Sequence, residues 1–300
     1  MGPEVDEAAA TQLQSAMGTW DQGAWCLAAL TLTVDPATDG QGPLLAAARD
    51  VLSAAGLWPV LGQPERLPFT ARELTGMAAG PLLHTAALAT RQTGGWAAQS
   101  EAALSAQGNA SGSAAAGFIR FALPHLGELA ERLATPGARM LDVGTGIGAL
   151  AIGFAAAFPH LHVTGIDVLA RALDIARADV AASPVASRIE LRLQDVADLT
   201  DQECYDLAWI PAPFVPEPAF TAGVARTVTA LRPGGLIMIG HVKFDGGELE
   251  NAITRFKTVT YGGTALDGPS AAKLLGEHGL HAAQTVATPP GAPGVTIGLR

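Results

Sequence analysis

The residues best suited to chemistry lie in one short segment, MLDVGTGIGAL at positions 140–150, where an apolar run meets three glycines and then a helical pattern. Gly144 permits a tight turn, Gly146 lets a ligand approach the main chain, and Gly148 allows the helix to pack closely on the strand. The N–H groups at the start of that helix suit a polar ligand. The segment therefore predicts a ligand-binding loop between a strand and a helix, although a merely tight turn is the alternative.

Three aspartates stand at the ends of three successive apolar runs. Asp142 precedes the first glycine by two positions, Asp167 ends VTGID, and Asp195 ends LRLQD. Asp167 lies about 20 residues beyond the glycines, where a carboxylate can accept hydrogen bonds from two ribose hydroxyls. Asp195 is suited to meet the amino group of an adenine. Each acid alone could be a solvated loop residue, but three at successive strand ends favour a ligand-binding role.

The elements that must position these residues alternate from position 139 onward. Short apolar runs, each typical of a buried strand, are separated by helical stretches. Such alternation predicts a parallel sheet covered on both faces. The expected strands are MLDVG at 140–144, HVTGID at 162–167, IELRLQD at 189–195, YDLAWI at 205–210 and GLIMIG at 235–240.

With these residues in view, the chain resembles the class I S-adenosylmethionine-dependent methyltransferases over about residues 139–300. LDVGTGIG is similar to the family's first motif, LRPGG at 231–235 is a family-like turn before the fifth strand, and SAAKLLGEHG followed by HAAQTVAT and GVTIGLR resembles the family's closing helix and hairpin. The resemblance implies an α/β, Rossmann-like, mainly parallel seven-stranded sheet with an antiparallel C-terminal strand. It also implies S-adenosyl-L-methionine as cofactor and methylation of a small organic molecule at oxygen or nitrogen.

The resemblance also assigns roles by position. Gly144 and Gly146 would line the methionine part of the cofactor, Asp167 would hold the ribose, and Asp195 with Val196 would border the adenine. The residues expected to bind the cofactor are Asp142, Gly144, Thr145, Gly146, Gly148, Asp167, Val168, Asp195, Val196 and Pro211.

Few catalytic groups are expected, because methyl transfer is an in-line displacement that depends mainly on alignment and the exclusion of water. A hydroxyl acceptor would benefit from a general base, for which histidine is suited. His241, in MIGHVKF just after the fifth strand, is the expected catalytic residue, and a surface or structural histidine is the alternative. No metal is expected, because the fourth strand ends in Trp209 and Ile210 instead of carboxylates.

The segment WIPAPF at 209–214 lies where many amino-group methyltransferases of this class carry Asn-Pro-Pro-Tyr. Here Ile210 replaces the amide and Phe214 replaces the tyrosine, which puts the presentation of an adenine or glutamine amino group in doubt. Trp209 and Phe214 could instead pack against an apolar acceptor. Core packing of Trp209 is an equal alternative.

The N-terminal part is expected to be a helical domain over residues 1–95, which covers the substrate and leaves room for dimerisation. Pro43 is placed to begin one helix and Gly56 to end it, and Thr70 with Glu73 could form a capping box. The cofactor-binding domain is expected over 96–300. Its stretch 96–117 is rich in small residues and is interpreted as a lid or hinge, followed by a helix over about 114–133 that Pro124 breaks or kinks.

The overall composition narrows the class of partner. The chain has 300 residues, of which 49% are hydrophobic, and a net charge of -10, which gives no support to a nucleic-acid partner. No apolar run reaches the length needed to span a membrane, and the N-terminus lacks the pattern of a secretory signal. The two cysteines, Cys26 and Cys204, indicate neither a disulfide framework nor a zinc site. A cytoplasmic enzyme acting on a small-molecule acceptor, with a homodimer as an open option, is therefore expected.

Two other functions remain open at this stage. Gly144, Gly146 and Ala149 also satisfy the dinucleotide pattern G-x-G-x-x-A, which would suit a nicotinamide-dependent oxidoreductase. Asp142, Asp195 and the closing hairpin disfavour it. Some relatives of the methyltransferase fold act as cyclases or as non-catalytic binders, because a fold does not fix a function.

Overall fold

The computed structural model describes residues 7–34, 42–61, 67, 69–119, 123, 127–288 and 292–300. The chain forms two compact units, residues 1–90 and 91–300. The first unit therefore ends at Thr90, whereas the helical domain expected from the sequence ended at 95.

Every regular element among the described residues of the N-terminal unit is a helix. Its helices are α1 (Glu7–Val34), α2 (Pro43–Ala54), α3 (Trp58–Leu61) and α4 (Ala71–Ala89). Pro43 begins α2 as expected. Thr70 caps α4 through a reciprocal pair of bonds with Glu73: the Glu73 N–H donates to the Thr70 hydroxyl at 3.2 Å, and the Thr70 N–H donates to the Glu73 carboxylate at 2.7 Å. The capping box read from the sequence is confirmed, and it satisfies two N–H groups that a helix start leaves open.

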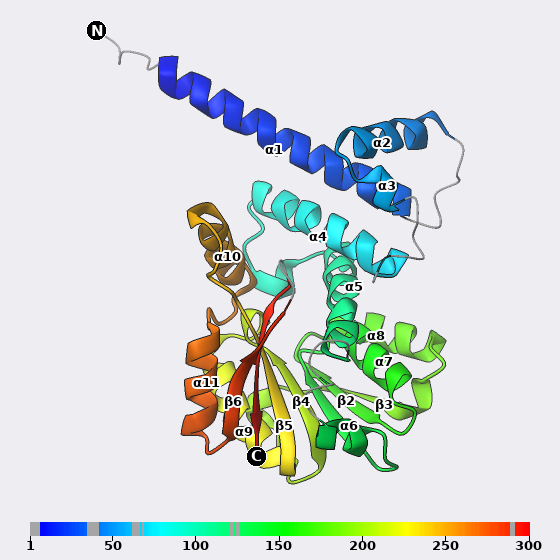
Figure 1. Ribbon diagram of the computed structural model, residues 1–300, viewed down its shortest axis with the longest axis vertical. Helices are drawn as coiled ribbons and strands as arrows, with labels where there is room; N and C mark the ends of the chain where they lie inside the picture. Colours follow the sequence, from blue (N-terminus) through cyan, green and yellow to red (C-terminus); the bar gives the residue numbers. More distant parts are fainter. Residues whose placement is uncertain are drawn as a thin grey trace. The chain divides into compact units, whose positions relative to one another are not determined.

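The second unit is built on one seven-stranded sheet with the order β3-β2-β1-β4-β5-β7-β6 (Figure 1). All neighbouring pairs from β3 to β5 are parallel, and β7 runs antiparallel to both β5 and β6. The expected mainly parallel sheet with an antiparallel C-terminal strand is confirmed. The strands are β1 (Arg139–Val143), β2 (His162–Asp167), β3 (Ile189–Leu193), β4 (Tyr205–Pro211), β5 (Leu231–His241), β6 (His281–Val286) and β7 (Gly294–Leu299).

Helices cover both faces of this sheet, as the continuous apolar strands require. The helices of the second unit are α5 (Glu101–Gly117), α6 (Gly127–Leu133), α7 (Ala149–Ala157), α8 (Ala170–Ala182), α9 (Glu217–Ala230), α10 (Glu248–Tyr261) and α11 (Gly268–Glu277). One core joins α6 and α7 to the face that carries Met140 and Met238. The other joins α9 and α11 to the face that carries Leu141 and Ile237.

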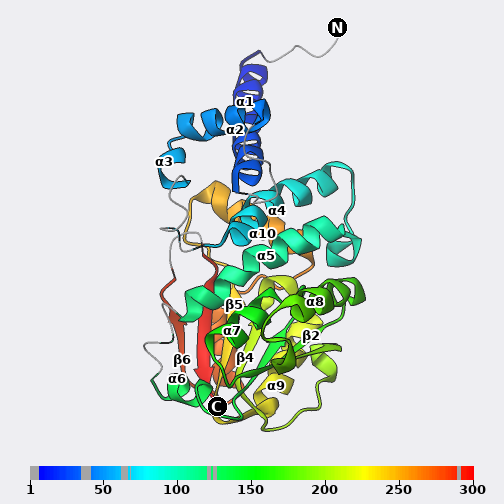
Figure 2. The same ribbon diagram turned by 90° about the vertical axis from the view of Figure 1, so that its right-hand side faces the viewer.

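Most of the small-residue stretch 96–117, interpreted as a lid or hinge, forms the helix α5 at 101–117. Its small residues serve close packing on α7, beside which α5 lies (Figure 2). A Cβ on Gly153 of α7 would lie 2.9 Å from the Ala115 side chain, and one on Gly108 would lie 2.3 Å from Ile147. The stretch 101–117 is thus a packed helix, and its role as a lid or hinge stays a prediction. The helix expected over 114–133 corresponds to the end of α5 and to α6, and Pro124 lies outside the described residues.

No helix in the part of the chain that the structure describes is both long enough and apolar enough to cross a membrane.

Candidate functional site

The glycine-rich segment forms a turn between β1 and α7 in which all three glycines take left-handed backbone conformations. The φ angles are 65° at Gly144, 56° at Gly146 and 77° at Gly148, in a region that residues with a side chain rarely adopt. The Gly148 N–H donates to the Thr145 carbonyl at 2.8 Å and closes the turn. Gly148 is also the N-cap residue of α7. The turn requires glycine at these three positions.

The turn lies against β4 on one side. A Cβ on Gly144 would lie 3.6 Å from Cγ of Pro211, the last residue of β4. The structure thus brings Pro211 to the border of the turn, where the sequence analysis expected a cofactor-lining residue. The order of the sheet explains this, because β1 and β4 are neighbours although residues 144–204 separate them in the sequence.

Asp142 is buried beside the turn and is hydrogen-bonded to it. Its side chain is 1% exposed, and the Thr145 hydroxyl donates to its carboxylate at 2.6 Å. Gly165, the register partner of Asp142 on β2, makes room for this contact, because a Cβ there would lie 2.7 Å from the Thr145 hydroxyl oxygen. Gly165 is a supporting residue that the sequence analysis did not select, although a glycine inside a strand is a signal of close approach.

Burial raises the pKa of Asp142 to about 7, while the bond from Thr145 lowers it and the charge of Asp167 raises it further. Close to neutral pH this carboxyl therefore titrates, and a nearby positive charge favours its ionised form.

Asp167 ends β2 and ties the glycine turn to the start of α8. Its carboxylate accepts the N–H of Gly146 at 2.8 Å and the N–H of Leu169 at 2.8 Å, one on each oxygen. Each oxygen keeps a lone pair for a further donor. Burial raises the pKa of Asp167, and the hydrogen bonds from the main chain oppose that shift. Val168, which follows it, is 67% exposed.

Asp195 and Val196 follow β3, two and three residues beyond its end at Leu193. The Asp195 carboxylate accepts the Ala197 N–H at 2.9 Å and caps a short 3-10 helix, η6 (Val196–Asp198). The Val196 side chain is buried against α9, where a Cβ on Gly223 would lie 2.5 Å from it. Its side chain thus belongs to the core.

His241 is the last residue of β5, whereas the strand expected from the sequence ended one residue earlier, at Gly240. The ring is 2% exposed. Nδ1 lies 2.9 Å from the Val242 carbonyl and Nε2 lies 3.1 Å from the Thr296 hydroxyl, so both nitrogens are hydrogen-bonded. Burial lowers the pKa of His241, and the bond to Val242 opposes the shift. In this arrangement the ring presents no open nitrogen to an acceptor, and a role as general base stays a prediction that requires the Thr296 bond to open.

Three aromatic side chains that no sequence spacing connects meet in the second unit. Trp96, in the 3-10 helix η2 (Gly95–Ala98), stacks on Tyr261 at the end of α10 with ring centroids 4.7 Å apart. Phe214, in η7 (Ala212–Phe214), lies edge-on to both rings, 5.3 Å from Trp96 and 5.6 Å from Tyr261. We call these three residues the aromatic cluster. Only Phe214 was selected from the sequence, because the other two lie on distant segments.

Trp209 does not join the aromatic cluster. It packs against the core under α7, and its ring fills the space above Gly240, where a Cβ would lie 2.6 Å from it. The structure therefore favours the core-packing alternative for Trp209. Among the described residues, no group of three or more His, Cys, Asp or Glu side chains is arranged to hold a metal ion.

Residues 140–235 match the family model described as "Methyltransferase domain". In sequence, the chain is 31% identical over 124 residues to a release factor glutamine methyltransferase of Rhodopirellula baltica, which covers 41% of this chain and 40% of that protein. It is 32% identical over 89 residues to a tRNA1(Val) (adenine(37)-N6)-methyltransferase of Phocaeicola vulgatus, covering 30% and 38%. The chain thus spans about two-fifths of the length of these curated relatives.

Solved structures resemble almost the whole chain. A structure of PigF with SAH matches at a TM-score of 0.64 and 17% identity, covering 99% of this chain and 100% of that one. The mitomycin 7-O-methyltransferase MmcR matches at 0.59 and 19%, covering 98% and 100%. Human N-acetylserotonin methyltransferase in complex with SAM matches at 0.57 and 17%, covering 100% and 99%. At these identities the likeness shows the fold.

Proposed function

We propose that this chain, whose residues 140–235 form a methyltransferase domain, transfers a methyl group from S-adenosylmethionine to a small organic molecule. The resemblance to class I methyltransferases is confirmed by that match and by the fold. The observation that carries the proposal is the glycine turn with its two aspartates, Asp142 bonded to Thr145 and Asp167 bonded to Gly146. The antiparallel β7 disfavours the nicotinamide-dependent alternative.

The groups around the turn fit this cofactor. Asp167 has an accepting lone pair left on each oxygen for the ribose hydroxyls. Gly144 and Gly146, with Thr145 between them, hold the main chain open beside the methionine part, and Gly148 and Pro211 shape the turn. Asp142 supplies a buried carboxyl near the positive charges of the methionine part. Val168, Asp195 and the main chain of Val196 border the adenine.

The chemistry requires alignment more than acid or base catalysis. Bound S-adenosylmethionine supplies an electrophilic methyl group on a positively charged sulfur. The fixed turn and the rigid loop Pro211–Pro213 hold the two reactants in line, and the apolar surroundings exclude water. An ionised Asp142 stabilises positive charge on the bound cofactor.

The proposed acceptor is a small apolar or aromatic molecule. The net charge of -10 argues against a polyanionic substrate. Phe214 of the aromatic cluster lies in η7, which follows β4 directly, so it belongs to the loop that leaves the proposed cofactor edge of the sheet. Aromatic faces of this kind bind planar apolar groups by stacking. Some curated relatives are named for tRNA or release-factor methylation, so such substrates are tested beside small molecules.

We also propose that residues 1–95 serve as a substrate-covering domain and that 96–300 bind the cofactor. Helix α5 is the proposed cover over the turn, because Gly108 lets it rest on Ile147, which lies between Gly146 and Gly148. A homodimer and a cytoplasmic location complete the proposal. Hydrogen exchange in residues 101–117 should slow when S-adenosylhomocysteine binds if α5 has this role.

The experiment that tests the proposed function is calorimetric titration of the full chain with S-adenosylhomocysteine and, separately, with NAD⁺. S-adenosylhomocysteine should bind and NAD⁺ should not. Mass spectrometry then follows the gain of one methyl group on panels of small hydroxyl and amino compounds, tRNA and release-factor peptides. Methylation confined to tRNA or protein would overturn the small-molecule acceptor, and failure to bind S-adenosylhomocysteine would overturn the proposal itself.

The role of His241 is tested by His241→Ala with a hydroxyl acceptor. If the ring is the general base, turnover should fall by ~10²-fold or more while cofactor affinity stays the same. Thr296→Val is the matched variant, because it removes the bond to Nε2 and leaves the ring in place. It should keep or raise turnover. Full turnover in His241→Ala together with a lower melting temperature would instead assign the ring to packing between β5 and β7.

A further inference from the structure

A cleft of about 480 Å³ lies at the edge of the sheet where the parallel strands begin. The glycine turn between β1 and α7 lies at the opposite edge. The walls of the cleft come from the starts of β1, β2, β3 and β5 and from the short 3-10 helix η5 (Ala186–Arg188). The volume falls in the range of small-molecule sites. Its polar and charged walls include Arg139, His162, Ser187, Arg188, Glu190 and Arg232.

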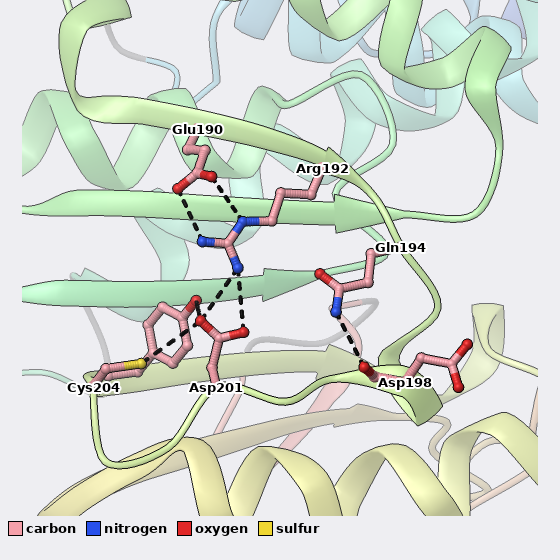
Figure 3. Close-up of polar contacts among 7 residues, drawn as sticks. Glu190, Arg192, Gln194, Asp198, Asp201 and Cys204 are labelled. Carbon is pink, nitrogen blue, oxygen red and sulfur yellow. Dashed lines mark hydrogen bonds and ion pairs between the residues drawn. The ribbon is translucent and has the colours of Figure 1, made fainter.

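The one carboxylate among the residues that line the cleft, Glu190, is bound by Arg192. Both oxygens of Glu190 accept bonds from Arg192, at 2.8 and 3.1 Å (Figure 3). Arg192 also donates to both oxygens of Asp201 at 3.2 Å, so it is held between two acids. Its bonds hold the pKa of Glu190 below the ordinary value. Glu190 is therefore bound by Arg192, while the charge of Arg139, which is not at ion-pair distance, also lowers its pKa.

One of the three cleft arginines is also neutralised. Arg232 donates to the buried carboxylate of Asp206 at 2.8 Å. Asp206 is 2% exposed and also accepts the main-chain N–H of Arg139 at 2.9 Å. Arg232 and Asp206 form a fixed ion pair in the cleft wall.

Arg139 and Arg188 have no carboxylate at ion-pair distance among the described residues. The Arg139 guanidinium lies over the Tyr205 ring, 5.6 Å from its centroid, and its Nε is buried without a hydrogen-bond partner in the described structure. Arg188 donates only to neutral carbonyls, those of Phe158 and Leu161, each at 2.9 Å. Two half-buried arginines without a carboxylate at ion-pair distance thus face one cleft in a chain whose net charge is -10, and leaving the buried Nε of Arg139 unsatisfied is costly.

We propose that this cleft binds a small organic anion through an oxyanion group, a phosphate or a carboxylate, held by Arg139 and Arg188. Guanidinium groups bind both oxyanions through paired, charge-assisted hydrogen bonds. The exposed Ser187 hydroxyl adds a neutral donor at the mouth. The ligand is larger than a single inorganic ion, because the volume accommodates an organic body beside the charged group.

The site is separate from the proposed methyl-transfer site. Arg139 begins β1 and Gly144 follows the end of that strand, which at ~3.3 Å per residue places them about 16 Å apart along the strand. Binding in the cleft therefore requires no contact with the cofactor, and the inference stands or falls without the proposed function.

The test is calorimetric titration of the full chain with pyrophosphate and with citrate at constant ionic strength, with sodium chloride as the reference. At least one anion should bind with saturable heat. Arg139→Gln and Arg188→Gln should each weaken that binding by roughly 10-fold or more. Binding of pyrophosphate alone identifies a phosphate ligand, and binding of citrate alone identifies a carboxylate ligand.

Two further variants keep the test decisive. Ser187→Asp adds a negative charge at an exposed position and should weaken binding even if the arginine variants fold poorly. Arg177→Gln makes the same charge change as Arg139→Gln on the exposed side of α8, where the Arg177 side chain is 52% exposed, and it should leave binding unchanged. Absence of saturable binding by either anion, or equal weakening in Arg177→Gln and Arg139→Gln, would overturn the proposal. S-adenosylhomocysteine affinity should be the same in all four variants.

Discussion

Asp167→Ala is expected to weaken S-adenosylhomocysteine binding by roughly 100-fold or more. The variant removes the two charge-assisted hydrogen bonds that we propose between Asp167 and the ribose, each expected to contribute about 1.5–3 kcal/mol. It also releases the Gly146 N–H, which Asp167 holds at 2.8 Å, and so loosens the turn that lines the methionine part. Calorimetry on the wild type and the variant measures the change.

The control for this variant is Asp174→Ala on α8. The Asp174 side chain is 71% exposed and pairs only with Arg177 one turn away, so cofactor affinity should not change. Asp167→Asn should fall between the two, because its amide oxygen still accepts a hydrogen bond but carries no charge. Unchanged affinity in a folded Asp167→Ala protein would remove Asp167 from the ribose site.

Asp142→Asn is expected to raise the melting temperature of the ligand-free protein by several degrees at about pH 8.5. The pKa of Asp142 is about 7 in the folded protein, above the 3.8 of an unperturbed carboxyl. Between these values the folded state binds the proton that the unfolded state has lost, so the free energy of unfolding falls as the pH rises through that window. The loss amounts to about 1.4 kcal/mol for each pH unit between the two pKa values. Asparagine is neutral at every pH, so the variant avoids this loss of stability.

The pH dependence separates this cause from any general effect of the substitution. Near pH 4 to 5 Asp142 is protonated in the folded protein, so the melting temperatures of variant and wild type should be similar, and their difference should grow toward pH 8.5. Asp174→Asn, at an exposed carboxylate, should show no such growth. A difference in melting temperature that stays constant with pH would contradict a buried, titrating carboxyl at Asp142. Asp142→Asn should also weaken binding of the positively charged S-adenosylmethionine.

The central strands could be predicted from the sequence because β1, β4 and most of β5 are covered on both faces and therefore appear as largely apolar runs, whereas β3 and β6 are partly exposed. The run HVTGID coincides with β2, and the glycines of the turn were recognisable because only glycine readily adopts their left-handed conformations. Asp142 and Asp167 could be selected from these strands and this turn, since the ends of parallel strands lie together at one edge of a sheet. These features depend on local pattern.

The remaining features depend on contacts between distant segments. The small residues of α5 suggested flexibility, but Gly108 and Ala115 are small because Ile147 and α7 lie against them. The aromatic cluster joins positions 96, 214 and 261, which no spacing relates. The burial of His241 follows from β7 and from Gly294, where a Cβ would overlap its ring. No single stretch of sequence contains that information.

The strand order has a consequence for how such an enzyme could be re-targeted. After β1 the chain adds β2 and β3 on one side, and then returns to place β4 and β5 on the other. The connections through α7 and α8 therefore lie on one face of the sheet, and α9 lies on the opposite face. As a result, the chain segments that leave β1 and β4 diverge from each other beside Gly144 and Pro211. This divergence of the two segments follows from the strand order and is independent of the acceptor. Chimeras that exchange residues 212–216 and 242–247 with those of a methyltransferase of similar structure should therefore retain cofactor affinity while acquiring a different acceptor preference.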